Sequence, residues 1–557
     1  MFKIYSLTIA LFAFNCYILQ TSAQGTFTQV HQILQTNCAG ASCHQYGGNP
    51  SFDVTGSEST VYNQLVNINP VNPYAKDSAR NKLIAPGYPD RSYLFRKIAH
   101  GLNENNSYLA LKQPHEGMNM PDGGGALSKT DIELIRQWIL FGAPLNGTVV
   151  DTALINKYYS GKGIDGTYPS HNPPAPGTGY QFYVGKIFIP PATETEYYIK
   201  HDPRITENLE VDNIVTMMPA ATHHFVLFTF LPGQSGSHPE GLRPLSAGSH
   251  GETGDGIGSG PNYREFQLPA GTAYFWPANS VFDFNLHIRN NNPDSVLAAD
   301  LYVNVLTQPL GTATDYMRVR NFPVFTISIP QDGQEHEFEE AAIDTNETKI
   351  WKIWMLYSHT HRYGTDYDIW LRNLNGTKGA QIYEGFYNQD YTFNQGFYAW
   401  GVDVAIRYFT PFLEVDPRLG FVHRARYKNT SGPDPVTFGD TSLDEMMVMG
   451  FQYVYGDDLG ALPSAVDNTS TAAIRFNVFP NPASRVLHLN YILPENSDVS
   501  VEMTNILGEH IVLLEKHSKA AGNYLEDVYL DSQLSTGVYQ ITLNVNGSIA
   551  TKRIVIE

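Results

Sequence analysis

The sequence predicts a multidomain, mainly β protein with one α-rich domain near its N-terminus. A chain of 557 residues exceeds what one hydrophobic core sustains, and about 150 residues per domain indicates three or four domains. Between residues 181 and 455, short apolar runs such as "VFDFNLHI" and "LYVNVLT" alternate with Gly, Pro, Asn and Asp. This punctuation is typical of antiparallel β-sandwiches or jelly rolls, and the length of the region fits two of them in tandem.

The N-terminal domain is predicted to be helical because its apolar residues recur at helical spacing. "TFTQVHQILQ" and "LSKTDIELIRQWILFGAP" both show this pattern. In the second, Ser128 is suited to cap the helix, and Gly142 with Pro144 would end it. The last domain contains "LHLNYIL" and "VYQITLNV", whose period-two alternation predicts half-buried strands of a small β-sandwich.

These patterns divide the chain into seven segments. They are a signal peptide (1–23), an α-rich domain (24–150), a Pro- and Gly-rich linker (151–180), two tandem β-sandwiches (181–325 and 326–456), a second linker (457–474) and a C-terminal β-sandwich (475–557).

The first segment has the features of a secretory signal peptide. Lys3 precedes an apolar stretch, and the small residues before Gln24 place the cleavage after Ala23. The alternative is a membrane anchor, for which the apolar run is short. Cys16 lies inside the peptide, so the mature chain keeps only Cys38 and Cys43, too few for a disulfide scaffold.

The charge of the chain bears on its partners. A formal net charge of -19 opposes binding to nucleic acid, and no basic run in the sequence offsets it. We therefore expect no nucleic-acid partner.

Histidines recur within the predicted strands of the middle region. His223 and His224 are adjacent at the head of "HHFVLFTF". Neighbouring side chains of a regular strand point to opposite faces, so both imidazoles can reach one partner only at a bulge or a strand end. His359 and His361, in "LYSHTHRYG", share one face of a strand and can meet one metal ion, the alternative being two exposed polar residues.

Two further residues have both a structural and a ligand interpretation. His287 interrupts the apolar strand "FDFNLHIRN", where a histidine is either a hydrogen-bonded structural residue or a ligand. Met446 follows an acidic pair in "TSLDEMMVMGFQYVY", where a methionine either fills the core or binds a metal. Met447 and Met449 are its rivals, and strand alternation would put Met447 on the opposite face.

The order His-His, His, His-x-His, Glu-Met over residues 181–455 resembles the copper type II, ascorbate-dependent monooxygenases, the family of dopamine β-monooxygenase and peptidylglycine α-hydroxylating monooxygenase. The spacings of 63 residues between the first two motifs and 72 between the next two are similar to those of the family. The resemblance implies an electron-transfer copper held by His223, His224 and His287. It implies an oxygen-binding copper held by His359, His361 and Met446.

The resemblance also implies an activity. Each jelly-roll domain would carry one of the two copper ions, facing the other across an open cleft, and each ion would supply one electron per dioxygen to hydroxylate a C–H bond of a small-molecule or peptide substrate. Ascorbate or another external reductant would restore the electrons. Imidazole binds both Cu(I) and Cu(II), whereas a thioether favours Cu(I). Residues 181–455 contain no cysteine, so the disulfides of the animal enzymes are absent and their substrate pocket is not carried over.

The N-terminal domain carries a second cofactor motif. "NCAGASCHQYGG" places four residues between Cys38 and Cys43, followed by His44, where the usual haem-attachment string is C-x-x-C-H. The surrounding sequence resembles small c-type cytochrome domains. That resemblance implies haem c with His44 and Met120 as axial ligands, Met118 being the alternative to Met120, and a relay of electrons to the three-histidine copper. The other interpretation is a short-loop disulfide in a domain without haem.

The C-terminal segment resembles the type A sorting domain of type IX secretion substrates, on the strings "PNPA", "LSTGVY" and "TKRIVIE". The resemblance implies a Bacteroidetes-type bacterium, contact with the type IX secretion machinery, and a secreted or cell-surface protein. An adhesive β-sandwich module is the alternative.

Together these motifs predict a secreted copper monooxygenase with a fused cytochrome c-like domain. Two other classes remain open. One is a copper- and haem-binding redox protein that performs no hydroxylation, and the other is a carbohydrate- or peptide-binding sandwich, which would bind no stoichiometric copper.

Overall fold

The computed structural model describes most of the chain after the predicted signal peptide. The described ranges are 24–40, 43–45, 52–76, 81–102, 114–123, 125–166, 172–245, 251–254, 256–260, 262–385, 397–398, 406–439, 441–460, 476–493, 495–505, 510–531, 534–546 and 548–556. They form two compact units, Met1–Leu459 and Gly460–Glu557. The predicted signal peptide lies outside the described residues. Within them, no helix is both long enough and apolar enough to cross a membrane.

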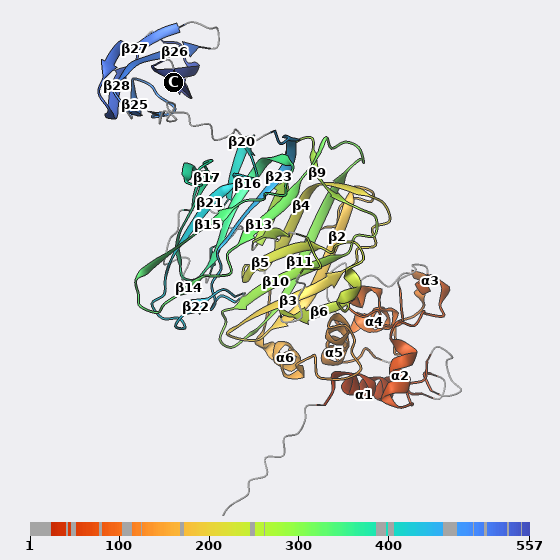
Figure 1. Ribbon diagram of the computed structural model, residues 1–557. Coiled ribbons are helices and arrows are strands. Elements are labelled where there is room, and N and C mark those ends of the chain that lie inside the picture. The colour runs from red at the N-terminus through yellow and green to blue at the C-terminus, as the bar shows by residue number, and fades with distance from the viewer. Residues whose placement is uncertain are drawn as a thin grey trace, which may run out of the picture. The chain divides into compact units, whose positions relative to one another are not determined.

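The first unit begins with helices packed around one apolar core (Figure 1). The α-helices are α1 (Thr26–Cys38), α2 (Glu58–Leu65), α3 (Pro73–Lys76), α4 (Tyr93–Ile98), α5 (Lys129–Leu140) and α6 (Thr152–Lys157), and the short 3₁₀ or π turns are η1 (Pro89–Arg91), η2 (Ala99–Leu102), η4 (Pro114–Glu116) and η5 (Tyr158–Lys162). The predicted cap is confirmed, because Ser128 Oγ accepts a hydrogen bond from Asp131 N. Ile135 and Trp138 of α5 are fully buried in the core.

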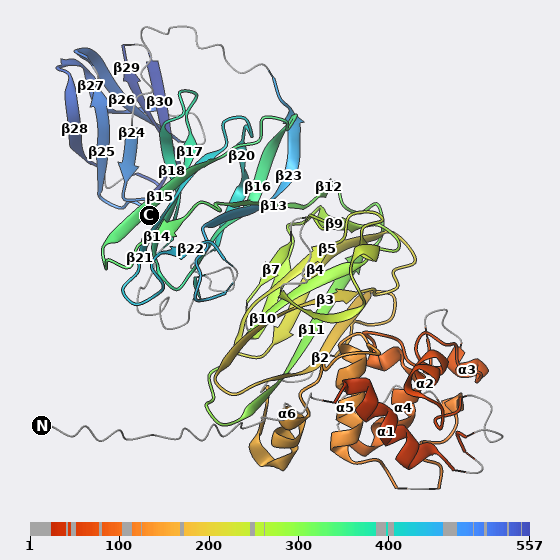
Figure 2. The same cartoon turned by 60° about the horizontal axis from the view of Figure 1, so that its bottom comes forward.

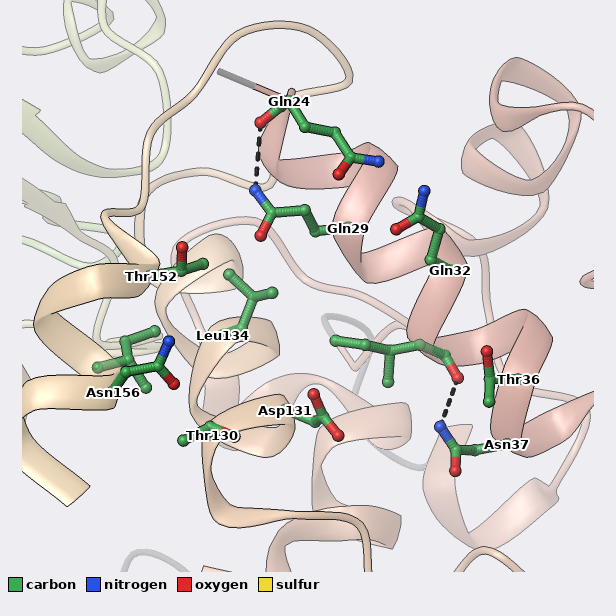
Figure 3. A pocket seen from close by; sticks show the side chains of 12 residues that line it. Gln24, Gln29, Gln32, Thr36, Asn37, Thr130, Asp131, Leu134, Thr152 and Asn156 are labelled. Atoms are coloured by element: carbon green, nitrogen blue, oxygen red, sulfur yellow. Dashed lines mark hydrogen bonds between the residues drawn. The ribbon is translucent and has the colours of Figure 1, made fainter. Parts of the chain in front are cut away.

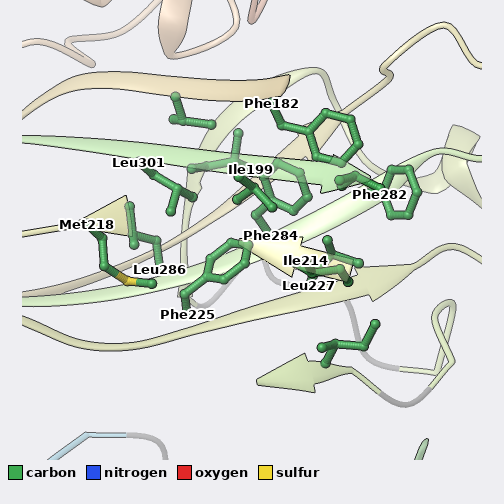
Figure 4. Close-up of a cluster of buried hydrophobic side chains, with 14 of the residues drawn as sticks. Phe182, Ile199, Ile214, Met218, Phe225, Leu227, Phe282, Phe284, Leu286 and Leu301 are labelled. Carbon is green, nitrogen blue, oxygen red and sulfur yellow. The ribbon is translucent and has the colours of Figure 1, made fainter. Parts of the chain in front are cut away.

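The next part of the unit is a pair of β-sheets. Its strands are β1 (Gly163–Asp165), β2 (Gly179–Ile189), β3 (Thr193–His201), β4 (Leu209–Met218), β5 (Thr222–Thr229), β6 (Gly241–Pro244), β7 (Ile257–Ser259), β8 (Asn262–Gln267), β9 (Thr272–Trp276), β10 (Phe282–Asn290), β11 (Val296–Gln308) and β12 (Asp315–Tyr316). One sheet has the order β1-β11-β4-β9-β12, with β2 beside β11 and β8 beside β4, and the other has the order β6-β3-β10-β5-β7. Phe182, Phe225, Phe284, Leu286 and Leu301 fill the core between them (Figure 4).

A second pair of sheets completes the unit. Its strands are β13 (Arg318–Pro323), β14 (Ser328–Ile329), β15 (Glu335–Ala342), β16 (Lys349–His361), β17 (Gly364–Arg372), β18 (Lys378–Gly385), β19 (Phe397–Tyr398), β20 (Ile406–Val415), β21 (Phe421–Lys428), β22 (Val436–Thr437) and β23 (Val448–Asp458). One sheet runs β13-β23-β16-β19 with β20 beside β16, the other runs β15-β21-β17-β18, and β14 pairs with β22. Trp351, Ile353, Leu356, Tyr367 and Phe451 are buried in the core.

Two predicted boundaries are wrong. The predicted linker 151–180 contains α6 and β1, because Ile155 is buried in the α-domain core and β1 pairs in parallel with β11. The predicted boundary between residues 325 and 326 falls too late, because β13 already pairs with β23 of the second sheet pair. Both errors have the same cause: the pairing partners lie far away in the sequence, and local composition does not report them.

The two sheet pairs pack directly on each other. Trp354, Met355 and Tyr357 of β16 belong to the same buried cluster as the core of the first pair. Tyr274 Oη of β9 donates a hydrogen bond to Gln452 Oε1 of β23 at 2.5 Å, and both side chains are buried. The face of β16 that carries Tyr357 therefore lies against the first sheet pair.

The helical domain also contacts the first sheet pair. Gln137 Nε2 of α5 donates to the Lys186 carbonyl of β2 at 2.5 Å, and Tyr88 Oη donates to Glu240 Oε2 at 3.0 Å. Figure 2 shows these helices beside β2 and β11. The three parts of the first unit therefore form a continuous packed body.

The second unit is all β in its described part. Its strands are β24 (Phe476–Phe479), β25 (Val486–Leu493), β26 (Ser497–Asn505), β27 (His510–Lys519), β28 (Gly522–Tyr529), β29 (Gly537–Val545) and β30 (Ser548–Ile556). They form sheets of order β24-β25-β28 and β27-β26-β29-β30. The predicted alternation is confirmed, because Leu487, Leu489, Ile541 and Leu543 are all buried in one core. The protein is thus mainly β.

Candidate metal centre

A β-bulge lies at the adjacent histidines His223 and His224. Strand β5 pairs with β10, and His287 lies opposite His224, but the next residue, Ile288, lies opposite Thr222. His223 is therefore an extra residue in β5. The bulge lets the rings of His223 and His224 turn to the same side of the sheet, as the sequence predicts.

The three histidines of β5 and β10 approach one another closely. His223 Nδ1 lies 2.9 Å from His287 Nδ1, and His287 Nδ1 lies 3.4 Å from His224 Nε2. One nitrogen from each ring can be chosen so that all three lie within 4.8 Å of one another. This spacing suits three imidazoles that bind one metal ion.

The His-x-His pair lies at the end of β16. His359 and His361 continue the face that carries Tyr357, whereas Leu356 points into the core of the second sheet pair. The two rings lie 5.0 Å apart between centroids, and the residues are 3% and 0% exposed. They are therefore buried on one face, as period-two alternation predicts, and not on a wet surface.

The two histidine groups meet in a single cluster. The ring centroids of His223 and His361 lie 6.2 Å apart, and those of His224 and His359 lie 6.1 Å apart. The resemblance to the copper monooxygenases implied two histidine groups that face each other across an open cleft. The structure instead gathers five imidazoles, including that of His287, between the two sheet pairs. The physical reason is the shared core, which holds β16 against the first pair.

The segment Thr441–Met447 passes beside this cluster. The buried Glu445 carboxylate accepts hydrogen bonds from the backbone nitrogens of His361, Tyr363 and Met446, the last two at 2.8 and 2.9 Å. Burial raises the pKa of Glu445 to about 8, and these hydrogen bonds only partly oppose it. Tyr427 Oη donates to the Met446 carbonyl at 2.8 Å. The backbone at residue 446 is therefore fixed next to the His-x-His strand.

The two alternative methionines, Met447 and Met449, are more deeply buried than Met446. Met447 and Met449 are fully buried members of the hydrophobic core. Met446 is only half-buried and lies outside that core. Both methionines at 446 and 447 precede β23, and they differ in burial as the sequence predicts, Met447 being buried and Met446 intermediate.

Burial lowers the pKa values of four of the imidazoles and so favours their neutral form. Desolvation, followed by the neighbouring histidines, lowers the pKa values of His223, His224 and His359 well below the usual range, and that of His361 to about 4. A neutral ring offers a lone pair to a metal. His361 Nδ1 donates to the Asp444 carbonyl at 3.3 Å, which leaves Nε2 as the lone-pair atom.

The chemistry of the donors fits a transition metal. Within the described part of the chain, His361 Nε2 is buried without a hydrogen-bond partner. Buried polar atoms rarely remain so unless a ligand satisfies them. Imidazole nitrogens together with a thioether sulfur are typical copper ligands, so the residues present suit copper.

Sequence reasoning missed Glu194 and Ser442, which also contact this cluster. Glu194 Oε1 lies 2.5 Å from His287 Nε2, and Glu194 Oε2 accepts a hydrogen bond of 2.5 Å from Ser442 Oγ. Burial opposes ionisation of Glu194, but the bonds from His287 and Ser442 outweigh it and hold its pKa at about 2. The alternation of Thr and Glu in "TETEYYIK" was a weak signal, because it did not show that β3 would pair with β10.

The proposed haem residues lie on the α-domain core. The backbone nitrogen of His44 donates to the Cys38 carbonyl at 3.1 Å, and the His44 ring stacks on Phe52 at 4.1 Å. Cys38, Phe52 and Met120 all pack against the same apolar cluster. Met118, the alternative to Met120, is 68% exposed. Residues 46–51 and 103–113, which separate these motifs, lie outside the described residues.

The disulfide alternative is not what the structure contains. Cys38 and Cys43 are both free thiols. Burial, and then the nearby Cys43, raises the pKa of the Cys38 thiol to about 11. Cys38 is therefore a neutral thiol at physiological pH.

A polar hollow of about 470 Å³ lies in the helical domain between α1, α5 and α6 (Figure 3). Amide and hydroxyl side chains line much of it, and Gln29 and Asn37 are hydrogen-bonded to backbone carbonyls of their own segment. The predicted metal and haem residues are not among its lining residues.

Comparison with known protein families identifies the C-terminal unit. Residues 477–557 match the family described as secretion system C-terminal sorting domain. This unit is a type IX secretion sorting domain. It directs the protein to the cell surface or the extracellular space and indicates an interaction with the secretion machinery. No curated protein matches the chain.

Solved structures give only remote similarities. A mutant of Salmonella alpha-2-macroglobulin is 13% identical, with 64% of this chain and 18% of that chain covered and a TM-score of 0.13. The β-glucuronidase of Lactobacillus rhamnosus is 12% identical (43% and 35% covered, TM-score 0.13), and that of Ruminococcus gnavus is 13% identical (40% and 35% covered, TM-score 0.14). This chain therefore spans about a third or less of these proteins, and TM-scores this low carry no argument about fold or function.

Proposed function

We propose that the protein is an exported copper-dependent monooxygenase, in which the two sheet pairs are the two jelly-roll copper domains of the family that the sequence resembles. The observation that carries the proposal is the gathering of five imidazoles in one cluster beside the fixed Met446 segment. The reaction would be R–H + O₂ + 2e⁻ + 2H⁺ → R–OH + H₂O, with both electrons taken from ascorbate or another external reductant.

The two ligand groups would have different roles. His223, His224 and His287 offer three nitrogen donors, a set that tolerates both copper oxidation states and suits a one-electron store. His359 and His361, completed by the thioether of Met446, form a softer set that favours Cu(I) and leaves a position for dioxygen. Bound copper would supply the one-electron chemistry, and the chain's own residues hold the ligands in place and exclude bulk water.

A test of the proposal uses the methionine. Met446→Ala is expected to lower reductant-dependent oxygen uptake roughly 100-fold or more, since even residues that only support metal ligands cost about 10–100-fold when mutated. The measurement is oxygen consumption by the copper-loaded protein with ascorbate, together with mass spectrometry of the organic product. Leu374→Ala, at an exposed position of the second sheet pair, is the control and should retain wild-type uptake. Unchanged uptake in both Met446→Ala and His359→Ala would exclude oxygen chemistry at this site.

One observation favours the second candidate, a redox protein that binds copper and haem without hydroxylating a substrate. His223, His287, His359 and His361 are each at most 4% exposed, which leaves little access for an organic molecule in this arrangement. The two functions differ in their products. Oxygen uptake that forms only reduced oxygen species, with no oxidised organic product, supports the redox protein.

The cytochrome-like domain is the proposed site of haem c. Protein made in a host with a cytochrome c maturation system is expected to show a c-type Soret and α band, since a thiol pair followed by histidine is the substrate of covalent attachment. Cys38→Ala with Cys43→Ala should remove the covalent haem, while His115→Ala, in a 3₁₀ turn of the same domain, should keep it. Wild-type protein without these bands under such conditions contradicts the assignment.

A further inference from the structure

We propose that Glu194 is a positioning residue that orients His287 and links the three-histidine group to the segment carrying Met446. The inference rests on the proposed function, because it concerns how this chain prepares its copper ligands. It assigns to one carboxylate a role in both ligand groups, which lie on different sheet pairs.

The first contact of Glu194 is with a proposed ligand. Its Oε1 accepts from His287 Nε2 at 2.5 Å and lies 3.7 Å from His223 Nδ1. A carboxylate on Nε2–H fixes the tautomer, so the lone pair of His287 lies on Nδ1. That atom faces His223 Nδ1 and His224 Nε2. Carboxylate–histidine–metal arrangements of this kind orient the ring and raise its basicity.

The second contact of Glu194 reaches the other sheet pair. Ser442 Oγ donates to Glu194 Oε2 at 2.5 Å, and Ser442 N donates to Oε1 at 3.4 Å. Ser442 is almost fully buried, so water does not compete well for this bond. Within the same segment, Asp444 and Glu445 bind the ring and backbone of His361. The Glu194 carboxylate therefore connects the first trio with the segment that presents Met446.

The two contacts have separable consequences. Loss of the charge at Glu194 should weaken the donor strength of His287 and make Cu(II) less favourable relative to Cu(I) at the trio, because a negative charge near the ligands stabilises the more positive ion. Loss of the Ser442 hydroxyl should leave the trio's affinity nearly unchanged, since His287 keeps its carboxylate. It should instead loosen the Met446 segment, which has its second attachment at Glu445.

The experiment measures copper binding at the trio alone, in a His361→Ala background. Competition with a chelator should show wild-type affinity for Ser442→Ala and for Glu207→Gln, the control at an exposed carboxylate between β3 and β4. Glu194→Gln should bind copper about 10–100-fold more weakly, with altered Cu(II) hyperfine splitting in electron paramagnetic resonance. Glu194→Asp, which retains the charge, should recover part of the affinity. Thermal unfolding of the copper-free variants verifies that each is folded.

The outcomes separate the inference from the function on which it rests. Glu194→Gln with wild-type affinity and an unchanged Cu(II) spectrum would overturn the positioning role. Equal weakening by Glu194→Gln and Glu207→Gln would also overturn it, because the effect would then follow from the loss of any negative charge on the protein. Failure of the parent protein to bind copper would instead contradict the proposed function.

Discussion

Replacing His287 with alanine is expected to remove one of the two copper ions and to lower oxygen uptake by at least about 100-fold. His287 lies close to both of the other histidines in the trio. Its ring centroid lies 4.3 Å from that of His223 and 5.0 Å from that of His224. Without it, the two bulged histidines of β5 lose the ring that faces them, and two nitrogen donors alone bind copper weakly.

Elemental analysis after removal of loosely bound metal measures this prediction. The expected stoichiometry is two copper ions for the wild-type protein and one for His287→Ala. His336→Ala is the control, because that histidine lies at the surface and pairs only with Asp332 among the described residues. A variant that retained both ions would show that His287 has only a structural role, which is the alternative that its sequence left open.

Deletion of residues 477–557 is expected to abolish appearance of the protein at the cell surface and in the medium, and to leave it inside the outer membrane. The deleted residues match the sorting domain and form a compact unit apart from the rest of the chain. The core of the sheet pairs draws no residue from that unit, so the remaining protein should keep its fold and copper affinity.

Fractionation of producing cells with antibody detection tests the deletion. The matched control is full-length His287→Ala, which should be exported normally because the sorting domain is intact. Export of the truncated chain at the wild-type level would contradict the requirement for the tail. Loss of copper binding in the purified truncated protein would contradict the independence of the two units.

Local rules predicted several features of the metal centre. Two adjacent histidines in a strand can face one partner only at a bulge or a strand end, and β5 has a bulge there. His359 and His361 share a face because strand alternation has a period of two.

Other features depended on contacts between distant segments. The resemblance to the copper monooxygenases implied two histidine groups separated by an open cleft. The packing of β16 on the first sheet pair instead brings the two groups together. Glu194 was not recognised, because its role depends on β3 lying beside β10 and on Ser442 arriving from the other sheet pair. No local sequence pattern indicates the pairing of β3 with β10 or the position of Ser442.

The sequence by itself determined the strands, the exported character of the chain and the shared face of His359 and His361, because these follow from side-chain period, backbone geometry and short motifs. Only the tertiary structure decided where one sheet pair ends and the next begins, that five imidazoles share one buried cluster, and that the Glu194 carboxylate joins His287 to Ser442. The physical reason is that sheet pairing and core packing bring together residues far apart in the chain, and the free energy that selects those contacts comes from burying whole faces rather than from any local motif.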